Sequence, residues 1–163
     1  MCVPFIFGET MDDIYYMKEA IKQAKKAESI DDVPVGAVIV HNDKIIARGY
    51  NKRTRNEQTA DHAEMIAIRK ACRKIGSWRL EDCTMYVTLE PCPMCAGAIL
   101  QSRMKRVVYG ARDPKAGALG SKMNLFSVEG LNHYPQINGG ILEEECSQML
   151  KQFFKKLRNK PAK

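Results

Sequence analysis

Hydrophobic and polar positions follow a helical period at the start of the chain and a strand-like pattern directly after it. Apolar residues recur at helical spacing on one face of residues 12–27, namely Ile14, Met17, Ala20, Ile21 and Ala24. Asp12 or Asp13 can cap this helix. Two apolar runs at 35–40 and 44–50 predict strands that are joined by a tight turn. The chain is therefore expected to open with a helix and a β-hairpin.

The rest of the chain alternates between strand-like and helix-like segments. The predicted elements are a polar, basic loop at 51–60, a helix at 62–75 that ends at Gly76, a strand at 85–90, a helix at 93–103, a strand at 106–110, a short helical piece near 123–128, a short strand near 136–141 and a final helix at about 143–157. The central strands lack a clean alternation of apolar and polar residues, as expected for strands buried on both sides. This order predicts a three-layer α/β/α fold whose mixed five-stranded sheet is covered by helices on both faces.

Length and composition suit one globular domain outside a membrane. The chain has 163 residues, of which 45% are hydrophobic and 28% are charged, and this balance argues against disorder. No apolar run approaches the roughly 18 residues that a membrane span needs. Residues 1–10 lack the basic leader and cleavage site of a signal peptide, so we expect an N-terminal extension followed by a single domain over residues 11–163. Without an export signal, the six cysteines indicate reduced thiols and a cytoplasmic location.

The net charge of +7 is concentrated at the end of the chain. Residues 148–163 hold six basic side chains and no acidic one, whereas the other 147 residues carry 20 basic and 19 acidic side chains. A localised positive segment indicates a polyanionic partner. The alternative is a solvated C-terminus that frays.

Cys92 and Cys95 open the helix predicted at 93–103. A spacing of three puts both sulfur atoms on one face of a helical turn, and Pro93 suits the first helical position. Cys92 would then lie near the N-cap, where the thiolate that binds metal is favoured. Such a pair can be part of a metal site, a redox-active pair or two buried thiols, and two cysteines alone do not complete a zinc site.

His62 can supply a third ligand, although a lone histidine is more often a surface or core residue. It stands two residues before Glu64. Residues two apart on a regular helix point about 200° away from each other. His62 and Glu64 can therefore meet at one site only if His62 lies at or before the first turn, and Asp61 as a helix cap is compatible with that.

One histidine and two cysteines are the three protein ligands of a catalytic zinc site, since structural zinc closes with four. Zinc lowers the pKa of a bound water to about 7. Glu64 within hydrogen-bond reach could take that proton and deliver it to a leaving group. The pattern therefore predicts a hydrolytic zinc enzyme.

The order His-x-Glu followed by Pro-Cys-x-x-Cys is the signature of zinc nucleobase deaminases. Beyond it, the sequence resembles the bacterial tRNA-specific adenosine deaminases over roughly residues 14–158. The resembling stretches are VPVGAVIV (33–40), GYN (49–51), DHAEMIAIRKA (61–71), TLEPCPMCAGAI (88–99), YGARDPKAGALGS (109–121), LNH (131–133) and FFKKLR (153–158). Cytidine deaminases usually carry Cys where this chain has His62, which counts against that branch.

The resemblance implies a cytidine-deaminase-like fold, a homodimer, and deamination of the wobble adenosine to inosine in a tRNA anticodon loop, with an arginine tRNA of anticodon ACG as the expected substrate. It makes His62, Cys92 and Cys95 the ligands of one zinc ion per subunit and Glu64 the proton shuttle. Asn51 matches a family asparagine that hydrogen-bonds the target purine, and its amide has the donor and acceptor this needs. The alternative for Asn51 is a turn residue after a strand.

The resemblance also implies a set of RNA contacts: Asp113, Lys115, Asn132, His133, Phe153, Phe154, Lys156 and Arg158. Asp113 before Pro114 is equally typical of an ordinary turn. Single-stranded bases stack on aromatic rings while Lys and Arg hold phosphates. At helical spacing with the neighbouring leucines, one of Phe153 and Phe154 is nevertheless expected in the core and the other at the RNA surface.

Two other functions stay open. A deaminase of a free base or nucleotide, such as guanine or a cytosine nucleotide, would act without RNA and would depend little on salt. A zinc-stabilised RNA-binding module without catalysis would be unaffected by Glu64→Gln, whereas the enzyme would lose turnover and keep its zinc.

Overall fold

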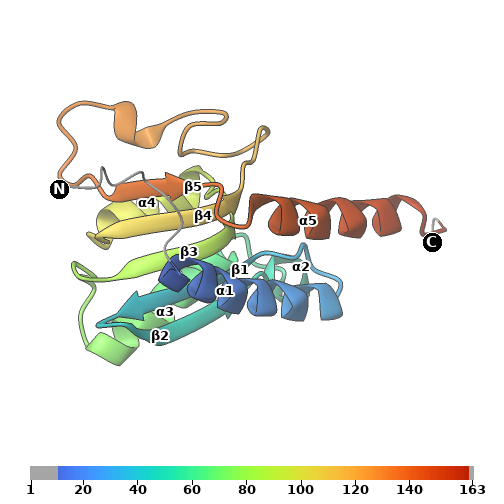
Figure 1. Cartoon of the computed structure of the whole chain (residues 1–163), viewed down its shortest axis with the longest axis horizontal. Coiled ribbons are helices and arrows are strands. Elements are labelled where there is room, and N and C mark those ends of the chain that lie inside the picture. The colour runs from blue at the N-terminus through green and yellow to red at the C-terminus, as the bar shows by residue number, and fades with distance from the viewer. Residues whose placement is uncertain (1–10, 162–163) are drawn as a thin grey trace.

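The sheet has five strands whose order places antiparallel pairs on one side of β3 and parallel pairs on the other. The computed structural model of the chain describes residues 11–161. The order across the sheet is β2-β1-β3-β4-β5, with β1 antiparallel to β2 and β3, and β4 parallel to β3 and β5 (Figure 1). The strands are β1 (Gly36–His41), β2 (Lys44–Tyr50), β3 (Thr84–Leu89), β4 (Arg106–Ala111) and β5 (Gln136–Gly139). The predicted mixed five-stranded sheet is confirmed.

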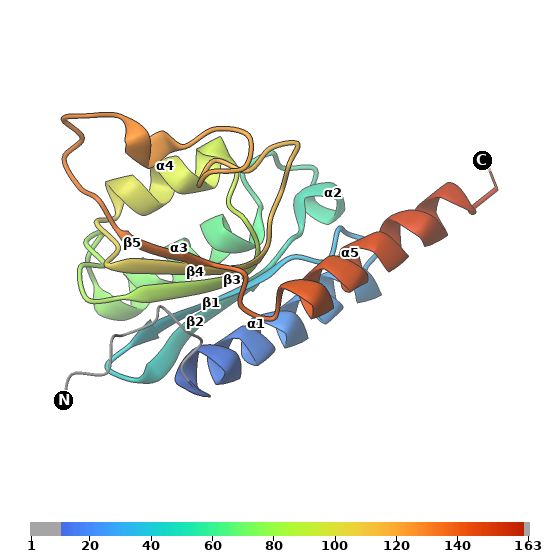
Figure 2. The same ribbon diagram turned by 45° about the horizontal axis from the view of Figure 1, so that its top comes forward.

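Helices cover both faces of this sheet. They are α1 (Met11–Ser29), α2 (Arg53–Asn56), α3 (Ala63–Ile75), α4 (Pro93–Gln101) and α5 (Glu143–Arg158), with a short 3-10 helix η1 (Leu125–Ser127). α3 and α4 pack on one face, and α1 and α5 pack on the other, where α5 runs alongside α1 (Figures 1 and 2). The three-layer prediction is therefore confirmed. Within residues 11–161, no helix combines the length and the apolar character that crossing a membrane requires.

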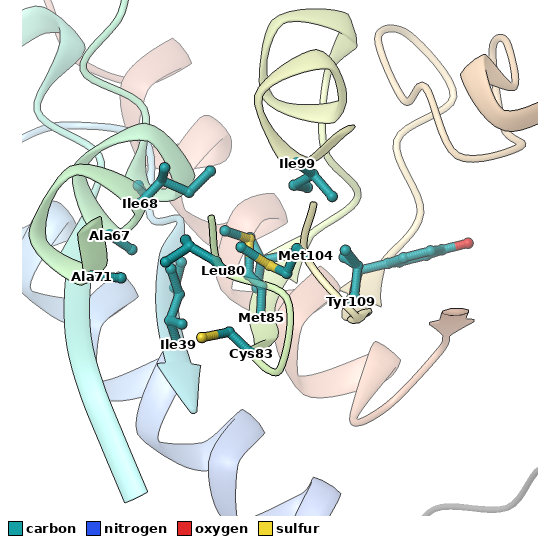
Figure 3. Close-up of a cluster of buried hydrophobic side chains, with 14 of the residues drawn as sticks. Ile39, Ala67, Ile68, Ala71, Leu80, Cys83, Met85, Ile99, Met104 and Tyr109 are labelled. Atoms are coloured by element: carbon teal, nitrogen blue, oxygen red, sulfur yellow. The ribbon is translucent and has the colours of Figure 1, made fainter. Parts of the chain in front are cut away.

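Successive residues of the central strands point into different layers. In β1, Ala37 and Ile39 pack toward α3 and α4, whereas Val38 and Val40 pack toward α1 and α5. Figure 3 shows the first of these clusters, in which Ile39 faces Ala67 and Ala71 of α3. Burial on both faces explains why the apolar runs of the sequence show no two-residue alternation.

Gly49 sets how closely α3 approaches the sheet. A Cβ at Gly49 would collide with the backbone carbonyl of Ala63 and approach the backbone nitrogen of Ala67. Only a residue without a side chain lets the first turn of α3 lie directly on β2. Because α3 begins at Ala63, this contact also fixes the start of the helix that carries Glu64.

Two local predictions are wrong. The sequence predicts a polar, basic loop at 51–60, but these residues contain the short helix α2. The predicted capping of α1 by Asp12 or Asp13 fails because α1 already begins at Met11. The Asp13 carboxylate instead accepts hydrogen bonds from the Tyr86 hydroxyl at 2.7 Å and from the Arg106 guanidinium at 2.8 and 2.9 Å.

Candidate metal centre and active site

The N-termini of α3 and α4 meet beside the C-terminal end of β3. His62 is the N-cap residue of α3 and Cys92 is the N-cap residue of α4, both in extended backbone conformation. Pro93 occupies the first helical position of α4, as predicted. The two halves of the sequence motif therefore converge at the edge of the sheet where ligand sites of α/β folds collect.

His62, Cys92 and Cys95 form a compact group of potential metal ligands. The Nδ1 atom of His62 lies 3.6 Å from the sulfur of Cys92 and 3.6 Å from the sulfur of Cys95. All three ligand atoms lie within 4.8 Å of one another. Zn–S and Zn–N bonds of about 2.3 and 2.0 Å in a tetrahedron separate neighbouring ligand atoms by about 3.5–3.8 Å. The donor set and its spacing therefore fit a zinc ion.

The electrostatics of the group favour negative charge on sulfur. A hydrogen bond from Cys95, followed by one from His62, lowers the pKa of Cys92 to about 4. The hydrogen bond to Cys92 raises the pKa of His62, and the hydrogen bond to Cys92 together with burial raises the pKa of Cys95. The Cys92 sulfur is thus favoured as a thiolate that accepts hydrogen bonds from its neighbours. The thiolate is the form that binds a metal, and a bound metal cation takes the place of those protons.

Glu64 lies beside this group, in the first turn of α3. It is 4% exposed, and burial raises the pKa of its carboxyl group. Because His62 stands at the N-cap and not inside the helix, both side chains line the same pocket, as the spacing argument required. Asp61 does not cap α3, contrary to the expectation. Its carboxylate accepts hydrogen bonds of 2.8 Å from Asn56 and from Arg69.

The pocket in front of Glu64 has a volume of about 190 Å³ and combines apolar walls with a few polar groups. Its lining residues are Val33, Val35, Asn51, Arg53, His62, Ala63, Glu64, Leu89, Glu90, Cys92, Asp113 and Ala116. A small, mostly apolar cavity with convergent polar groups is typical of a small-molecule binding site.

Asn51 is 7% exposed and lies in the wall of this pocket. Its amide nitrogen donates to the carbonyl of Val33 at 3.2 Å, and its amide oxygen accepts from the backbone N–H of Arg53 at 3.0 Å. An asparagine amide has a second hydrogen and a second lone pair. Both ends of the side chain are thus fixed while each keeps one hydrogen-bonding position for a ligand.

Comparison with known proteins agrees with this geometry. The chain matches the MafB19-like deaminase family over residues 11–158. It is 55% identical over 151 residues to the tRNA-specific adenosine deaminase of Bacillus subtilis (strain 168), with 93% of each chain covered. It is 50% identical over 145 residues to the tRNA-specific adenosine deaminase of Rickettsia bellii (strain RML369-C), covering 88% of this chain and 100% of that protein.

The chain belongs to the tRNA-specific adenosine deaminase family. A solved structure from work on A-to-I editing by tRNA:A34 deaminases at the wobble position of transfer RNA is 40% identical, with a TM-score of 0.79 and coverage of 83% of this chain and 99% of that chain. A guanine deaminase from Nitrosomonas europaea, 22% identical with a TM-score of 0.75, covers 94% of this chain and 93% of that chain and shares the fold.

The residues that the family resemblance assigned to RNA lie in three places. Asp113 lines the pocket, and Lys115 is exposed on the same loop. Asn132 is exposed, while the ring of His133 contacts the carbonyl of Met104. Met104 precedes β4, so within one chain Asn132 and His133 lie at the opposite edge of the sheet from the ligand group. The structure does not bring this pair to the pocket.

The remaining RNA candidates lie on α5. Phe153 is 8% exposed and Phe154 is 40% exposed, which confirms that one ring is buried and the other faces outward. The buried Phe153 cannot stack on a base in this conformation, whereas the ring of Phe154 is accessible at the surface. Lys156 and Arg158 are exposed, and Lys156 lies 3.7 Å from Glu28 of α1.

Sequence reasoning missed two buried carboxylates that shape the pocket. Asp32 is 1% exposed and Glu90 is 2% exposed. Glu90 was expected to end the strand at 85–90, but β3 ends at Leu89 and the Glu90 side chain lines the pocket. Its position directly before Pro91-Cys92 was the only local signal.

Proposed function

We propose that the protein catalyses hydrolytic deamination of the wobble adenosine to inosine in a tRNA anticodon loop, with an arginine tRNA of anticodon ACG as substrate. The observation that carries the proposal is the convergence of His62, Cys92 and Cys95 beside the buried Glu64. Membership of a family whose curated relatives are named tRNA-specific adenosine deaminases supports the choice of substrate.

His62, Cys92 and Cys95 would hold one Zn²⁺ ion per subunit. Three protein ligands leave a fourth position open, as in catalytic zinc sites. When bound, zinc supplies Lewis-acid activation of the attacking water. The remaining chemistry belongs to side chains of this chain.

Glu64 acts as the proton shuttle. Its carboxylate takes a proton from the attacking water as the oxygen bonds to C6 of adenine, and delivers that proton to N1. It then carries the second proton of the water to the amine, which leaves as ammonia while the C6–N bond breaks and a C6 carbonyl forms. Because burial raises the pKa of Glu64, the carboxyl group is suited to hold a proton between these steps.

Asn51 orients the base. The free hydrogen and the free lone pair of its amide can pair with the edge of a purine inside the pocket. The wobble nucleotide would have to leave the stack of the anticodon loop to reach this position. Asp113, Lys115, Asn132, His133, Phe154, Lys156 and Arg158 are the proposed RNA contacts, with Phe153 retained as their structural support.

The domain bounds, the oligomeric state and the cellular location are proposed as well. The family match begins at residue 11, which supports a single domain from there on and an extension over residues 1–10, which lie outside the described part of the chain. A homodimer is proposed from family membership. A tRNA substrate would place the enzyme in the cytoplasm.

The test is inosine formation in an arginine tRNA with an ACG anticodon, compared with free adenosine, cytidine and guanine. We expect inosine only with RNA. Ammonia release from a free base alone would instead identify a free-base deaminase, a class whose fold this chain shares.

Metal and catalysis are separated by three variants. Glu64→Gln should lose turnover and keep zinc, while Cys95→Ser should lose zinc. Cys72→Ser, which changes a half-buried cysteine outside the ligand group, should keep both. If Glu64→Gln changed nothing measurable, Glu64 would not be the proton shuttle, and the alternative of a zinc-stabilised RNA-binding module without catalysis would be favoured.

A further inference from the structure

Glu90 is a buried carboxylate that makes no ion pair with any residue of the described part of the chain. It lies between β3 and α4, two residues before Cys92, and is 2% exposed. Its own N–H donates to the carbonyl of Ala111 at 2.8 Å, so its backbone is tied to the end of β4. A buried charge persists only where hydrogen bonds compensate it. The identity of those donors shows what Glu90 holds.

All four donors to Glu90 come from the loop that follows β4. Oε1 accepts from the N–H of Asp113 at 3.3 Å and from the hydroxyl of Ser121. Oε2 accepts from the N–H of Leu119 at 3.0 Å and from the N–H of Ser121 at 3.2 Å. The Glu90 carboxylate thus accepts hydrogen bonds from both ends of the segment 113–121, which we call the pocket loop.

The pocket loop wraps closely around this carboxylate. A Cβ at Gly117 would collide with the Glu90 carboxylate, so the loop can pass at this distance only with glycine there. The N–H of Ala118 donates to the carbonyl of Pro91 at 2.8 Å, which ties the loop to the residue just before Cys92. The loop is therefore built around Glu90.

The pocket loop carries part of the wall in front of Glu64. Asp113 and Ala116 line the pocket. The Asp113 carboxylate accepts from the N–H groups of Lys115 and Ala116 at 3.0 and 3.2 Å, which fixes the turn that it starts. Since the N–H of Asp113 is itself held by Glu90, the position of this wall depends on the Glu90 carboxylate.

A glutamine could not replace this arrangement. A carboxylate accepts through two oxygens with about four lone-pair sites, whereas a glutamine amide has one accepting oxygen and two N–H donors. In Glu90→Gln one end of the amide would point N–H groups at N–H donors of the loop. Leaving buried donors unpaired destabilises the arrangement they belong to.

We propose that Glu90 is a positioning residue that holds the pocket loop in the conformation that binds the substrate. The inference rests on the proposed deaminase function and assigns Glu90 to substrate binding, not to metal binding or proton transfer. The side chain acts through Asp113 and Ala116, while the chemistry stays with Glu64.

The experiment compares Glu90→Gln with Glu129→Gln, the same chemical change at an exposed glutamate outside the pocket loop. Steady-state kinetics on the tRNA substrate should show a KM raised about tenfold or more in Glu90→Gln, with kcat within about threefold of the unaltered enzyme and full zinc content. Hydrogen exchange of the Leu119 and Ser121 amides should be faster. Glu129→Gln should match the unaltered enzyme in every respect.

Ser121→Ala provides a milder variant that should fold even if Glu90→Gln does not. It removes one of the four donors, and we expect KM to rise about two- to threefold. An unchanged KM in both variants, a fall in kcat without a rise in KM, or loss of zinc from Glu90→Gln would each overturn the proposal. Failure of the unaltered enzyme to form inosine would instead refute the proposed function.

Discussion

The Asp32 carboxylate accepts a 2.9 Å hydrogen bond from the backbone N–H of Arg55, 23 residues further along the chain. Its second oxygen accepts from the N–H of Thr54 at 3.1 Å. These N–H groups belong to the first turn of α2, whose own N-cap residue, Lys52, makes no side-chain capping bond. Asp32 therefore caps α2 from the loop between α1 and β1 and fixes α2 at the rim of the pocket.

Removing this charge should destabilise the protein. We expect Asp32→Asn to lower the free energy of unfolding by about 1–2 kcal/mol, because one amide oxygen cannot replace two accepting oxygens at a helix start. Urea unfolding checks the value. Asp31→Asn alters the exposed neighbour, whose pair with Lys160 is solvent-exposed, and should change stability by less than about 0.5 kcal/mol. Equal effects at both positions would contradict the capping role.

Asp61 should make the free energy of unfolding depend on pH. The hydrogen bond from Asn56, followed by that from Arg69, lowers the pKa of Asp61 in the folded protein. A lowered pKa means that Asp61 stabilises the fold above its unfolded pKa of about 3.9, and that this contribution disappears as the pH falls through the lower folded value. The stability difference between the unaltered protein and Asp61→Asn should therefore be largest near neutral pH and shrink below about pH 4.

Urea unfolding at a series of pH values measures that difference. Arg69→Gln removes the second of the two side-chain donors and should reproduce part of the loss at neutral pH. The explanation fails if the difference between Asp61→Asn and the unaltered protein stays constant down to pH 3.

The elements and the ligand group were predictable because their signals are local. The helical spacing of α1 and the Pro-Cys-x-x-Cys start of α4 each lie within a few residues. Helix geometry gave the condition under which His62 and Glu64 could share one site, and the N-cap position of His62 meets that condition.

The wrong or missing predictions involve partners that are distant in sequence. Asp13 bonds to Arg106, 93 residues away, and so does not serve as a cap. In α2, the N–H groups of Thr54 and Arg55 donate to the distant Asp32, and only the N–H of Arg53 finds a local acceptor, Asn51. The sequence around Glu90 predicts the end of a strand. The four donors that hold its carboxylate come from a loop more than 20 residues later, so they leave no local signal. Periodicity cannot report such contacts.

Alanine substitutions of Phe153 and Phe154 should have different effects, one on stability and the other on tRNA binding. Phe153 is buried, so Phe153→Ala should lower the free energy of unfolding by about 3–4 kcal/mol. Phe154→Ala should leave stability within about 1 kcal/mol but weaken tRNA binding, since stacking of one base is worth about 1–3 kcal/mol. Thermal unfolding and tRNA titration distinguish the two. Unchanged tRNA affinity in Phe154→Ala would remove this ring from the RNA surface.

The basic end of the chain should contribute to tRNA affinity through charge. Deleting residues 155–163 removes five cations and keeps Phe153 and Phe154. Each phosphate contact adds about 0.7–0.9 to the slope of log affinity against log salt. Lys156 and Lys160 lie 3.7 and 3.4 Å from Glu28 and Asp31, so they are partly neutralised within the protein. We therefore expect the slope to fall by about 2–3, less than five full contacts would give.

The measurement is tRNA affinity at several salt concentrations, with zinc content determined on the same samples. The double variant Lys44→Gln and Lys74→Gln is the control, because neither exposed lysine is a proposed RNA contact and both lie away from the ligand group. Lys44 begins β2 at the turn of the β1–β2 hairpin, and Lys74 lies in the last turn of α3, the end opposite to His62, so the slope should stay unchanged. Zinc content should be the same in all three proteins, since residues 155–161, the described part of this segment, are not among the ligand group or the residues that line its pocket. If deletion weakens binding equally at all salt concentrations, the segment contributes packing and not charge. If it changes nothing, these lysines are only solvated.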